Sequence, residues 1–241
     1  MLGQLPPYYH DIPQDLPDYD QASSLIDIVD LKTTVAPEGA AKYVRTKVHV
    51  VERANGSTGY QVVNEMAPGV SLLPIDIVSG HAYAILVDQM RYPHLRPQDE
   101  DMGMSLDEAA QAGRIGRWSR EVLSGGANPS ESLEEAALRE GAEEAGIVGL
   151  TPDRVRRLFP TLGSSVSVNR QPFNLFYARL KDGEFQPQLA YPDLDEGNMH
   201  IGAYRLDTAV PEMIENGTVW ELSTVLALTG LHLAADLRKY L

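Results

Sequence analysis

The sequence contains no cysteine, which excludes disulfides, thiolate metal sites and cysteine nucleophiles. It is also poor in basic residues, because 20 Lys and Arg stand against 34 Asp and Glu and give a formal net charge of −14 at pH 7. Proteins bind nucleic acid through clustered Lys and Arg, so we expect no nucleic-acid partner. An acidic chain can still bind an anionic small molecule where metal ions and a few arginines reverse the local field.

Long hydrophobic runs are absent as well. No segment approaches the roughly 20 apolar residues that span a bilayer, and residues 1–20 lack the basic and apolar regions of a signal peptide. With 43% hydrophobic residues over 241 positions, the composition suits one large globular domain or one core with a smaller module. We therefore expect a soluble cytoplasmic protein with no membrane partner.

Residues 125–147, GGANPSESLEEAALREGAEEAGI, carry the clearest pattern. Ser132 with Glu135 is a capping-box pair, and Gly146 suits a left-handed residue after a helix, so the sequence predicts a helix from about Ser132 to Ala145. At about 100° per residue, one helical face carries the glutamates together with apolar residues: Leu133, Ala136, Ala137, Glu140, Glu143 and Glu144. The opposite face is predicted to carry Leu138, Ala142 and Ala145.

Three crowded carboxylates on a partly buried face repel one another unless a cation compensates them. Carboxylate oxygens at this density favour Mg²⁺ or Mn²⁺, which keep waters and bridge to substrate phosphates. Glu131, at the start of the helix, is placed to pair with Arg139 or to reach the metal. Gly125 and Gly126 let the backbone approach phosphates closely. The alternative is an exposed helix whose glutamates are simply solvated.

The spacing of these residues resembles the Nudix signature, G-x5-E-x7-R-E-U-x-E-E-x-G-U, in which U is an apolar residue. Eight of the nine defined positions match: Gly125, Glu131, Arg139, Glu140, Glu143, Glu144, Gly146 and Ile147. The ninth holds Gly141, which is predicted to leave less packing beneath the helix. A fixed spacing over so many residues is far more specific than a short glycine motif, and it implies a metal-dependent hydrolase of a diphosphate.

Outside this segment the chain resembles the ADP-ribose pyrophosphatase branch of the Nudix superfamily, from about Tyr43 to the C-terminus. The resemblance rests on paired N-terminal strands, on DQMR at 88–91, on EVLSG at 121–125 and on the tail IENGTVWELSTVLALTGLHL. In that branch the N-terminal strands are exchanged between subunits, which implies a homodimer. One departure concerns the substrate, because the branch has proline before glycine in a loop after the box, whereas this chain has Leu162 before Gly163.

Candidate roles for single residues follow from the pattern and the resemblance. The candidate metal ligands are Glu140, Glu143, Glu144, Glu131 and the carbonyl of Ser124. The candidate catalytic residues are Arg139 and a general base, for which Glu196, beside Asp195 on a late loop, competes with Glu143 and Glu144. The candidate substrate-binding residues are Arg91, Glu121, Gly125 and Gly126. Arg91 is otherwise a solvated arginine at a strand exit, and Glu121 either holds its turn or contacts substrate.

The remaining pattern predicts three regions: an N-terminal arm at 1–40, a small antiparallel strand module at 41–67 around Asn55-Gly56, and a Nudix domain at 68–241. Within the domain, strands are predicted at 69–78, 81–88, 155–160, 172–180 and 199–206, and helices at 208–215 and 221–240. Residues 97–116 form a polar insertion with a short helical pattern at 105–112, and this insertion is either a lid or a surface loop. This order favours an α/β Nudix fold, a mixed-sheet α/β/α sandwich.

The sequence therefore predicts a Mg²⁺-dependent pyrophosphatase that splits a nucleoside diphosphate linked to another group. ADP-ribose or another nucleotide sugar leads the substrates that the resemblance implies. Two alternatives remain. One is the same chemistry on a dinucleoside polyphosphate or an oxidised nucleotide, and the other is a ligand-sensing Nudix domain without catalysis.

Overall fold

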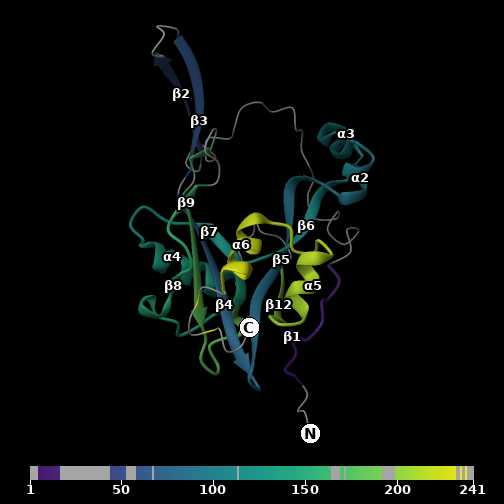
Figure 1. The fold of residues 1–241 in the computed structure, drawn as a ribbon, viewed down its shortest axis with the longest axis vertical. Coiled ribbons are helices and arrows are strands. Elements are labelled where there is room, and N and C mark those ends of the chain that lie inside the picture. The colour runs from purple at the N-terminus through teal and green to yellow at the C-terminus, as the bar shows by residue number, and fades with distance from the viewer. Residues whose placement is uncertain are drawn as a thin grey trace.

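The computed structural model describes residues 5–16, 44–52, 58–66, 68–112, 114–163, 169–170, 172–191, 199–231, 234 and 237. Within these residues, nine strands form one mixed sheet with helices on both faces (Figure 1). This architecture confirms the predicted α/β/α sandwich.

The described strands and helices have the following bounds. The strands are β1 Tyr9–His10, β2 Val44–Glu52, β3 Thr58–Met66, β4 Gly69–Val78, β5 His81–Leu95, β6 Ile115–Glu121, β7 Leu123–Gly126, β8 Arg156–Arg157, β9 Leu162–Gly163, β10 Asn169–Arg170, β11 Pro172–Arg179 and β12 His200–Arg205. The helices are α2 Pro97–Asp101, α3 Leu106–Gln111, α4 Leu133–Ala145, α5 Ala209–Glu215 and α6 Leu222–Gly230, with 3₁₀ turns η2 Pro152–Arg154 and η3 Pro187–Leu189. None of the described helices is long and apolar enough to cross a membrane.

The large sheet has the strand order β1-β12-β5-β4-β11-β8. In addition, β6 pairs with β5, β7 with β4 and β9 with β11. The pairs β1–β12 and β4–β11 are parallel, and the other pairs are antiparallel. Because β7 lies beside the start of β4, with Gly126 opposite Gly69, the beginning of the box segment is tied to the middle of the sheet.

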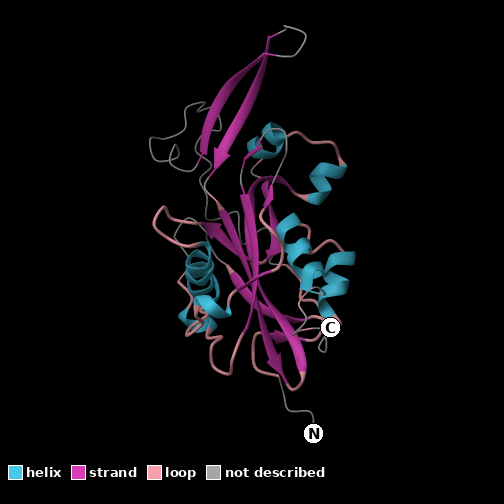
Figure 2. Cartoon of the chain, turned by 60° about the vertical axis from the view of Figure 1, so that its left-hand side comes forward, coloured by secondary structure: helices cyan, strands magenta, loops and turns pink. Residues whose placement is uncertain are grey.

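A hydrophobic core lies on each face of the sheet. Figure 2 shows the helices that cover the strands from either side. Side chains alternate along β4, so Leu73 and Ile75 pack toward α5 and α6, while Val70 and Leu72 pack toward α4. Because both faces are covered, the first seven residues of β4 are all buried. The box helix α4 is therefore held against a rigid layer.

The predicted hairpin is present as β2 and β3, which pair antiparallel from Val44 opposite Met66 to Glu52 opposite Thr58. It projects away from the body of the protein (Figure 1). The turn signal Asn55-Gly56 lies outside the described residues. The prediction of a two-stranded module is incomplete, because β10 adds to β3 in parallel and makes a three-stranded sheet.

Several predicted boundaries are wrong. β5 continues to Leu95 instead of ending at residue 88, because its second half pairs with β6. The predicted strand at 155–160 shrinks to β8, since Pro160 cannot donate to a sheet ladder. Residues 115–126, for which no strand was predicted, form β6 and β7. The helix predicted from 221 to 240 ends at Gly230 as α6, and most residues beyond 231 lie outside the described ranges.

The insertion at 97–116 has the helix predicted at 105–112, which is present as α3, and a second short helix before it. It contains α2 and α3, and its last residues begin β6. Asp99 in α2 has no exposed surface and forms an ion pair with Arg114, while Ala109 in α3 is fully buried. A charge buried in this way is costly unless it is paired, so the insertion is a packed part of the domain.

The N-terminal residues 5–16 line an edge of the sheet. β1 pairs in parallel with β12, with Tyr9 opposite Ala203. The hydroxyl of Tyr9 donates to Asp76, and that of Tyr83 donates to Asp11 Oδ1 at 2.7 Å. Burial, followed by this hydrogen bond, raises the pKa of Tyr83 to about 12. Residues 5–16 of the predicted arm thus pack against the body of their own chain.

Candidate active site

Helix α4 is built by the local signals that the sequence predicted. The Ser132 hydroxyl accepts from the Glu135 amide at 3.2 Å, and the Glu135 carboxylate accepts from the Ser132 amide at 2.8 Å. Gly146 ends the helix with φ 64°, and an added Cβ there would lie 2.1 Å from the carbonyl oxygen of Gln186. Glycine therefore suits this position for both its backbone angle and its packing.

The buried face of α4 carries two of the box glutamates. The buried residues are Ala136, Ala137, Glu140, Gly141, Glu144 and Ala145. Glu140 and Glu144 are only 5% and 1% exposed, so the alternative of a helix with solvated glutamates is wrong. The side chain of Glu143 is 23% exposed and lies at the rim of this face. The placement of Ala145 on the opposite face was also wrong, because it follows Gly141 by one turn and packs into the same core.

Gly141 does not leave a gap beneath the helix, contrary to the prediction. A Cβ at this position would lie 3.0 Å from Leu72 Cδ2 and 3.6 Å from Ile147 Cβ. The side chain of Leu72 from β4 therefore fills the space that a bulkier residue would take. The departure from the signature at this position changes packing and removes no polar group from the site.

Arg139 organises the carboxylates on the outer side of the site. Its Nε donates to Glu131 Oε1 at 3.0 Å, and its Nη1 donates to Glu140 Oε1 at 2.7 Å and Glu143 Oε2 at 2.9 Å. Its Nη2 donates to the Gly126 carbonyl at 2.8 Å. Of the two roles expected for Glu131, the structure therefore shows the pairing with Arg139.

The electrostatic consequence is a permanent positive charge among the carboxylates. Burial would lower the pKa of Arg139, but hydrogen bonds and charge from Glu131, Glu140 and Glu143 outweigh it and raise the pKa. Burial likewise acts to raise the pKa of Glu131, but hydrogen bonds from Arg139 and Asn128 outweigh it and lower the pKa. Arg139 thus positions three glutamates and stays charged throughout any working pH range.

Gly125 is required by the close approach of Glu140. A Cβ added to Gly125 would lie 2.0 Å from Glu140 Oε1, whereas a Cβ added to Gly126 would meet nothing within 4 Å. Only glycine leaves room for the Glu140 carboxylate against the backbone of β7. The sequence suggested approach of phosphates for both glycines, but at Gly125 the close neighbour in the structure is a carboxylate.

Replacing Gly125 with Ala is expected to displace the Glu140 side chain, lower the unfolding free energy by about 1–3 kcal/mol and reduce kcat at least ~10-fold. Denaturant unfolding and steady-state kinetics measure the two effects. Gly126→Ala is the matched variant, and its unfolding free energy should stay within about 0.5 kcal/mol of the parent. Equal destabilisation by both substitutions would contradict the close approach of Glu140.

Glu144 connects the helix to β7. Its Oε2 accepts a hydrogen bond from the Ser124 amide at 2.9 Å. Ser124 lies opposite Ser71 in the pairing of β7 with β4. The carboxylate and the Ser124 backbone are therefore fixed beside each other at the centre of the sheet, as a shared ligand site requires.

Arg91 and Glu121 form a pair on neighbouring strands. Arg91 Nε lies 2.9 Å from both carboxylate oxygens of Glu121, and Arg91 Nη2 forms an ion pair with the same group. Arg91 lies within β5 and is not a solvated residue at a strand exit. Burial lowers the pKa of Arg91, but Glu121 and, through its charge, Glu144 outweigh this and raise it. The Arg91 guanidinium thus interacts electrostatically with Glu144, one of the box glutamates.

Sequence reasoning missed the groups that support this pair. Arg120 is completely buried, and its guanidinium donates to Asp88 at 2.6 and 2.8 Å and to the Gln14 carbonyl at 2.9 Å. On the other side of Glu121, the Val122 amide donates to Thr224 Oγ1 at 3.0 Å, and Thr224 is held by Glu221 at the start of α6. The partners lie 32 and 102 positions apart in sequence, so no local pattern could reveal them.

The proposed general base, Glu196, and its neighbour Asp195 lie outside the described residues. In the described part of the chain, no three acidic or histidine side chains are arranged to hold a metal ion. The box carboxylates accept hydrogen bonds from the chain itself. Arg139 donates to Glu131, Glu140 and Glu143, and the Ser124 amide donates to Glu144. The donors are nevertheless all oxygen atoms concentrated on one helical turn, and this chemistry fits a hard divalent cation.

Comparison with known proteins decides the family. Residues 104–214 match the family model of the NUDIX domain, which includes the whole box segment. Residues 104–214 are therefore a NUDIX domain. With four box glutamates and Arg139 in register, the protein is a Nudix pyrophosphatase, a hydrolase of phosphoric anhydrides, and enzymes of this family generally use divalent cations.

A solved structure shares the Nudix fold of this protein. It is described as the crystal structure of ADP compounds hydrolase, and it matches with a TM-score of 0.54 and 18% sequence identity over 86% of this chain and 93% of that chain. At this identity the likeness concerns the fold. No curated protein matches the sequence.

Proposed function

We propose that this Nudix enzyme hydrolyses the diphosphate of a nucleoside diphosphate linked to another group, with ADP-ribose or another nucleotide sugar as substrate. The observation that carries the proposal is the pair of buried glutamates, Glu140 and Glu144. Glu140 lies against Gly125, and Glu144 accepts a hydrogen bond from the Ser124 amide. The charge of Glu144 also interacts with that of Arg91. The name of the structural neighbour, an ADP compounds hydrolase, supports the choice of substrate class.

A divalent cation, Mg²⁺ or Mn²⁺, held by Glu140, Glu143, Glu144 and the Ser124 carbonyl would neutralise the diphosphate and lower the pKa of the attacking water. The chain's own residues then have separate tasks. Arg139 keeps the carboxylates in place and Glu131 keeps Arg139 in place. Gly126, where an added Cβ would meet nothing within 4 Å, would let the backbone approach a substrate phosphate. We propose Glu196 as the general base, with Glu143 and Glu144 as the competing candidates.

Arg91 is proposed to bind a substrate phosphate, and Glu121 to orient it. The guanidinium has five donors, and Glu121 occupies only its Nε edge and one terminal nitrogen. The side chain of Arg91 is 35% exposed while that of Glu121 is 2% exposed, so Arg91 is the more accessible member of the pair. Such a charge-assisted contact suits a phosphate oxygen.

Arg91→Ala is expected to lower kcat/KM by ~10-fold or more, because it removes a charged contact to phosphate. Glu121→Gln should have a smaller effect, since the positive charge remains and only its orientation is loosened. Steady-state kinetics on the two variants checks this order. A larger loss with Glu121→Gln than with Arg91→Ala would assign the substrate contact to Glu121.

We also propose a cytoplasmic homodimer in which the hairpin β2–β3 contacts a second copy of the chain. The hairpin projects from the body (Figure 1), and two or three strands alone do not bury both of their faces. Light scattering at micromolar concentration should therefore give twice the chain mass of 26.5 kDa. A mass of one chain would exclude the dimer.

A substrate panel tests the proposed function. It contains ADP-ribose, a second nucleotide sugar, a dinucleoside polyphosphate and an oxidised nucleoside triphosphate, each with Mg²⁺ and with EDTA. We expect the highest kcat/KM for one of the first two, with both monophosphate products detected by mass spectrometry. A preference of ~10-fold or more for either of the last two would move the enzyme to another substrate class.

A further inference from the structure

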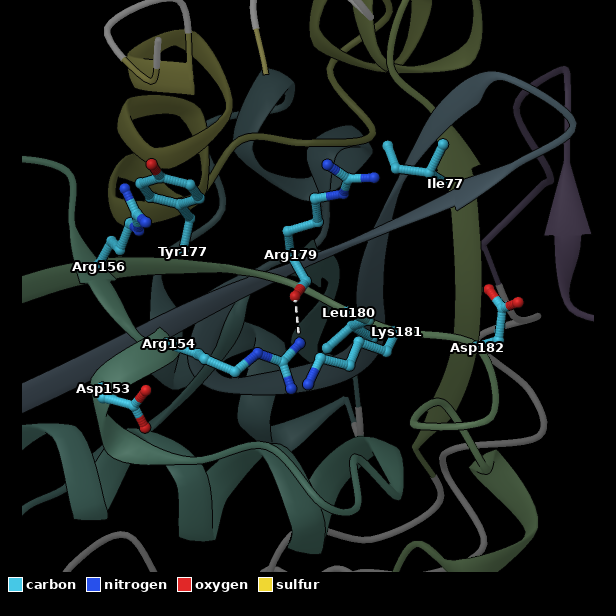
Figure 3. A pocket seen from close by; sticks show the side chains of 9 residues that line it. All are labelled: Ile77, Asp153, Arg154, Arg156, Tyr177, Arg179, Leu180, Lys181 and Asp182. Atoms are coloured by element: carbon cyan, nitrogen blue, oxygen red, sulfur yellow. Dashed lines mark hydrogen bonds between the residues drawn. The ribbon is translucent and has the colours of Figure 1, made fainter. Parts of the chain in front are cut away.

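A cavity lies far from the box glutamates. It has a volume of about 800 Å³ and lies near the far ends of β4 and β11 (Figure 3). β4 begins at Gly69, opposite Gly126 of the active site, and reaches the cavity at Ile77, eight residues later. At about 3.3 Å per residue, this separation is about 26 Å. The cavity is therefore not part of the diphosphate site.

Positive charge dominates the lining of this cavity. Four basic side chains, Arg154, Arg156, Arg179 and Lys181, face it together with two aspartates, Asp153 and Asp182. This balance reverses that of the whole chain, in which 34 acidic residues outnumber 20 basic ones. A local concentration of cations on an acidic protein repels its own members and is stabilised by an anion.

The sheet register explains why these groups converge. Arg156 of β8 lies directly opposite Tyr177 of β11, and Arg179 follows Tyr177 by two residues, so all three side chains share one face of the sheet. Arg154 is fixed by an ion pair with Glu184 and by a hydrogen bond of 2.7 Å from its Nη2 to the Arg179 carbonyl (Figure 3). The cavity wall is thus preformed by backbone pairing and by one anchored arginine.

Two of the cations are available for a ligand. Arg156 and Lys181 have exposed side chains and form no ion pair among the described residues, although the charge of Lys181 also acts on the carboxylates of Asp153 and Glu184. Arginine presents a planar fork that matches two phosphate oxygens, and lysine adds a mobile point charge. We propose that this cavity is a second, non-catalytic binding site for a small phosphorylated molecule, held by Arg156 and Lys181 over the wall formed by Arg154 and Arg179.

The test uses the full chain and inorganic diphosphate as the probe. Isothermal titration in EDTA, which suppresses binding at the metal-dependent site, compares the parent with the double variant Arg156→Ala/Lys181→Ala. The double variant should bind diphosphate at least ~10-fold more weakly, because two charge-assisted contacts are lost. Both substituted side chains are exposed, so circular dichroism should show an unchanged fold.

Two matched variants make the result specific. Arg157 is the neighbour of Arg156 but stacks on Phe176 with its guanidinium carbon 5.3 Å from the ring centre, and Arg157→Ala should leave diphosphate binding unchanged. Arg91→Ala, which disables the active-site arginine, should also leave it unchanged. Loss of binding only in Arg91→Ala, no measurable binding by the parent at millimolar diphosphate, or equally tight binding of citrate would each overturn a phosphate site in this cavity.

Discussion

Glu144→Gln is expected to lower kcat by at least ~10²-fold with the fold intact, and Glu143→Gln is expected to do the same. Both substitutions keep the size of the side chain and remove a negative charge from the face that is proposed to hold the cation. Glu144 is 1% exposed and accepts from the Ser124 amide, so its replacement also weakens the link between α4 and β7. Excess EDTA should abolish activity in the parent enzyme for the same reason.

Glu134→Gln provides the matched control, because Glu134 lies on α4 but outside the box positions. Its kcat should stay within about threefold of the parent, since the loss of one half-buried charge outside the box positions has a small effect on the reaction. Full activity of both Glu143→Gln and Glu144→Gln, or full activity in EDTA, would contradict metal-dependent hydrolysis. Circular dichroism and unfolding midpoints distinguish lost chemistry from lost structure.

Asp88→Ala is expected to lower the unfolding free energy by about 3–5 kcal/mol, because it leaves a buried guanidinium without its carboxylate. Arg120 has no exposed surface, and Asp88 supplies two of its hydrogen bonds. The remaining partners of Arg120 are the Gln14 carbonyl, the Met213 sulfur and the ring of Tyr204, whose centre lies 4.2 Å away. None of these neutralises its charge. Urea unfolding measures the loss.

The exposed pair of Arg205 and Asp207 serves as the comparison. Asp207 has a side chain that is 37% exposed, and Asp207→Ala should cost no more than about 1 kcal/mol. The double variant Asp88→Leu/Arg120→Met should recover most of the loss of Asp88→Ala, because no unpaired charge remains. A loss below about 1 kcal/mol for Asp88→Ala would show that water or another group compensates Arg120.

The parts of the site that are local in sequence could be predicted. The capping pair, Gly146 and the box glutamates lie within 23 residues, and helical periodicity alone brings Glu140 and Glu144 to one face. The same reasoning placed Ala145 on the wrong face, because a buried face is wider than a single line of positions. It also offered two roles for Glu131, and the structure shows one of them, the hydrogen bonds to Arg139.

The parts that depend on strand pairing could not be predicted. Arg91 meets Glu121 only because β5 extends to Leu95 and pairs with β6, and the sequence predicted neither feature. The contact between Gly125 and Glu140 arises from the packing of β7 on α4, which no spacing encodes. Gly141 was interpreted as a missing side chain, yet Leu72 from a strand 69 positions earlier fills the space. Non-local packing of this kind is visible only in three dimensions.

The most direct test is a product analysis of ADP-ribose hydrolysis in ¹⁸O-labelled water with Mg²⁺. Cleavage of the diphosphate by water gives AMP and ribose 5-phosphate, and one ¹⁸O atom enters one of these two monophosphates. We predict both products in equal amounts, with the label in one of them and with turnover by Glu144→Gln at least ~10²-fold slower. If ADP-ribose and other nucleotide sugars all remain intact in the presence of Mg²⁺ and folded enzyme, the proposed function is contradicted.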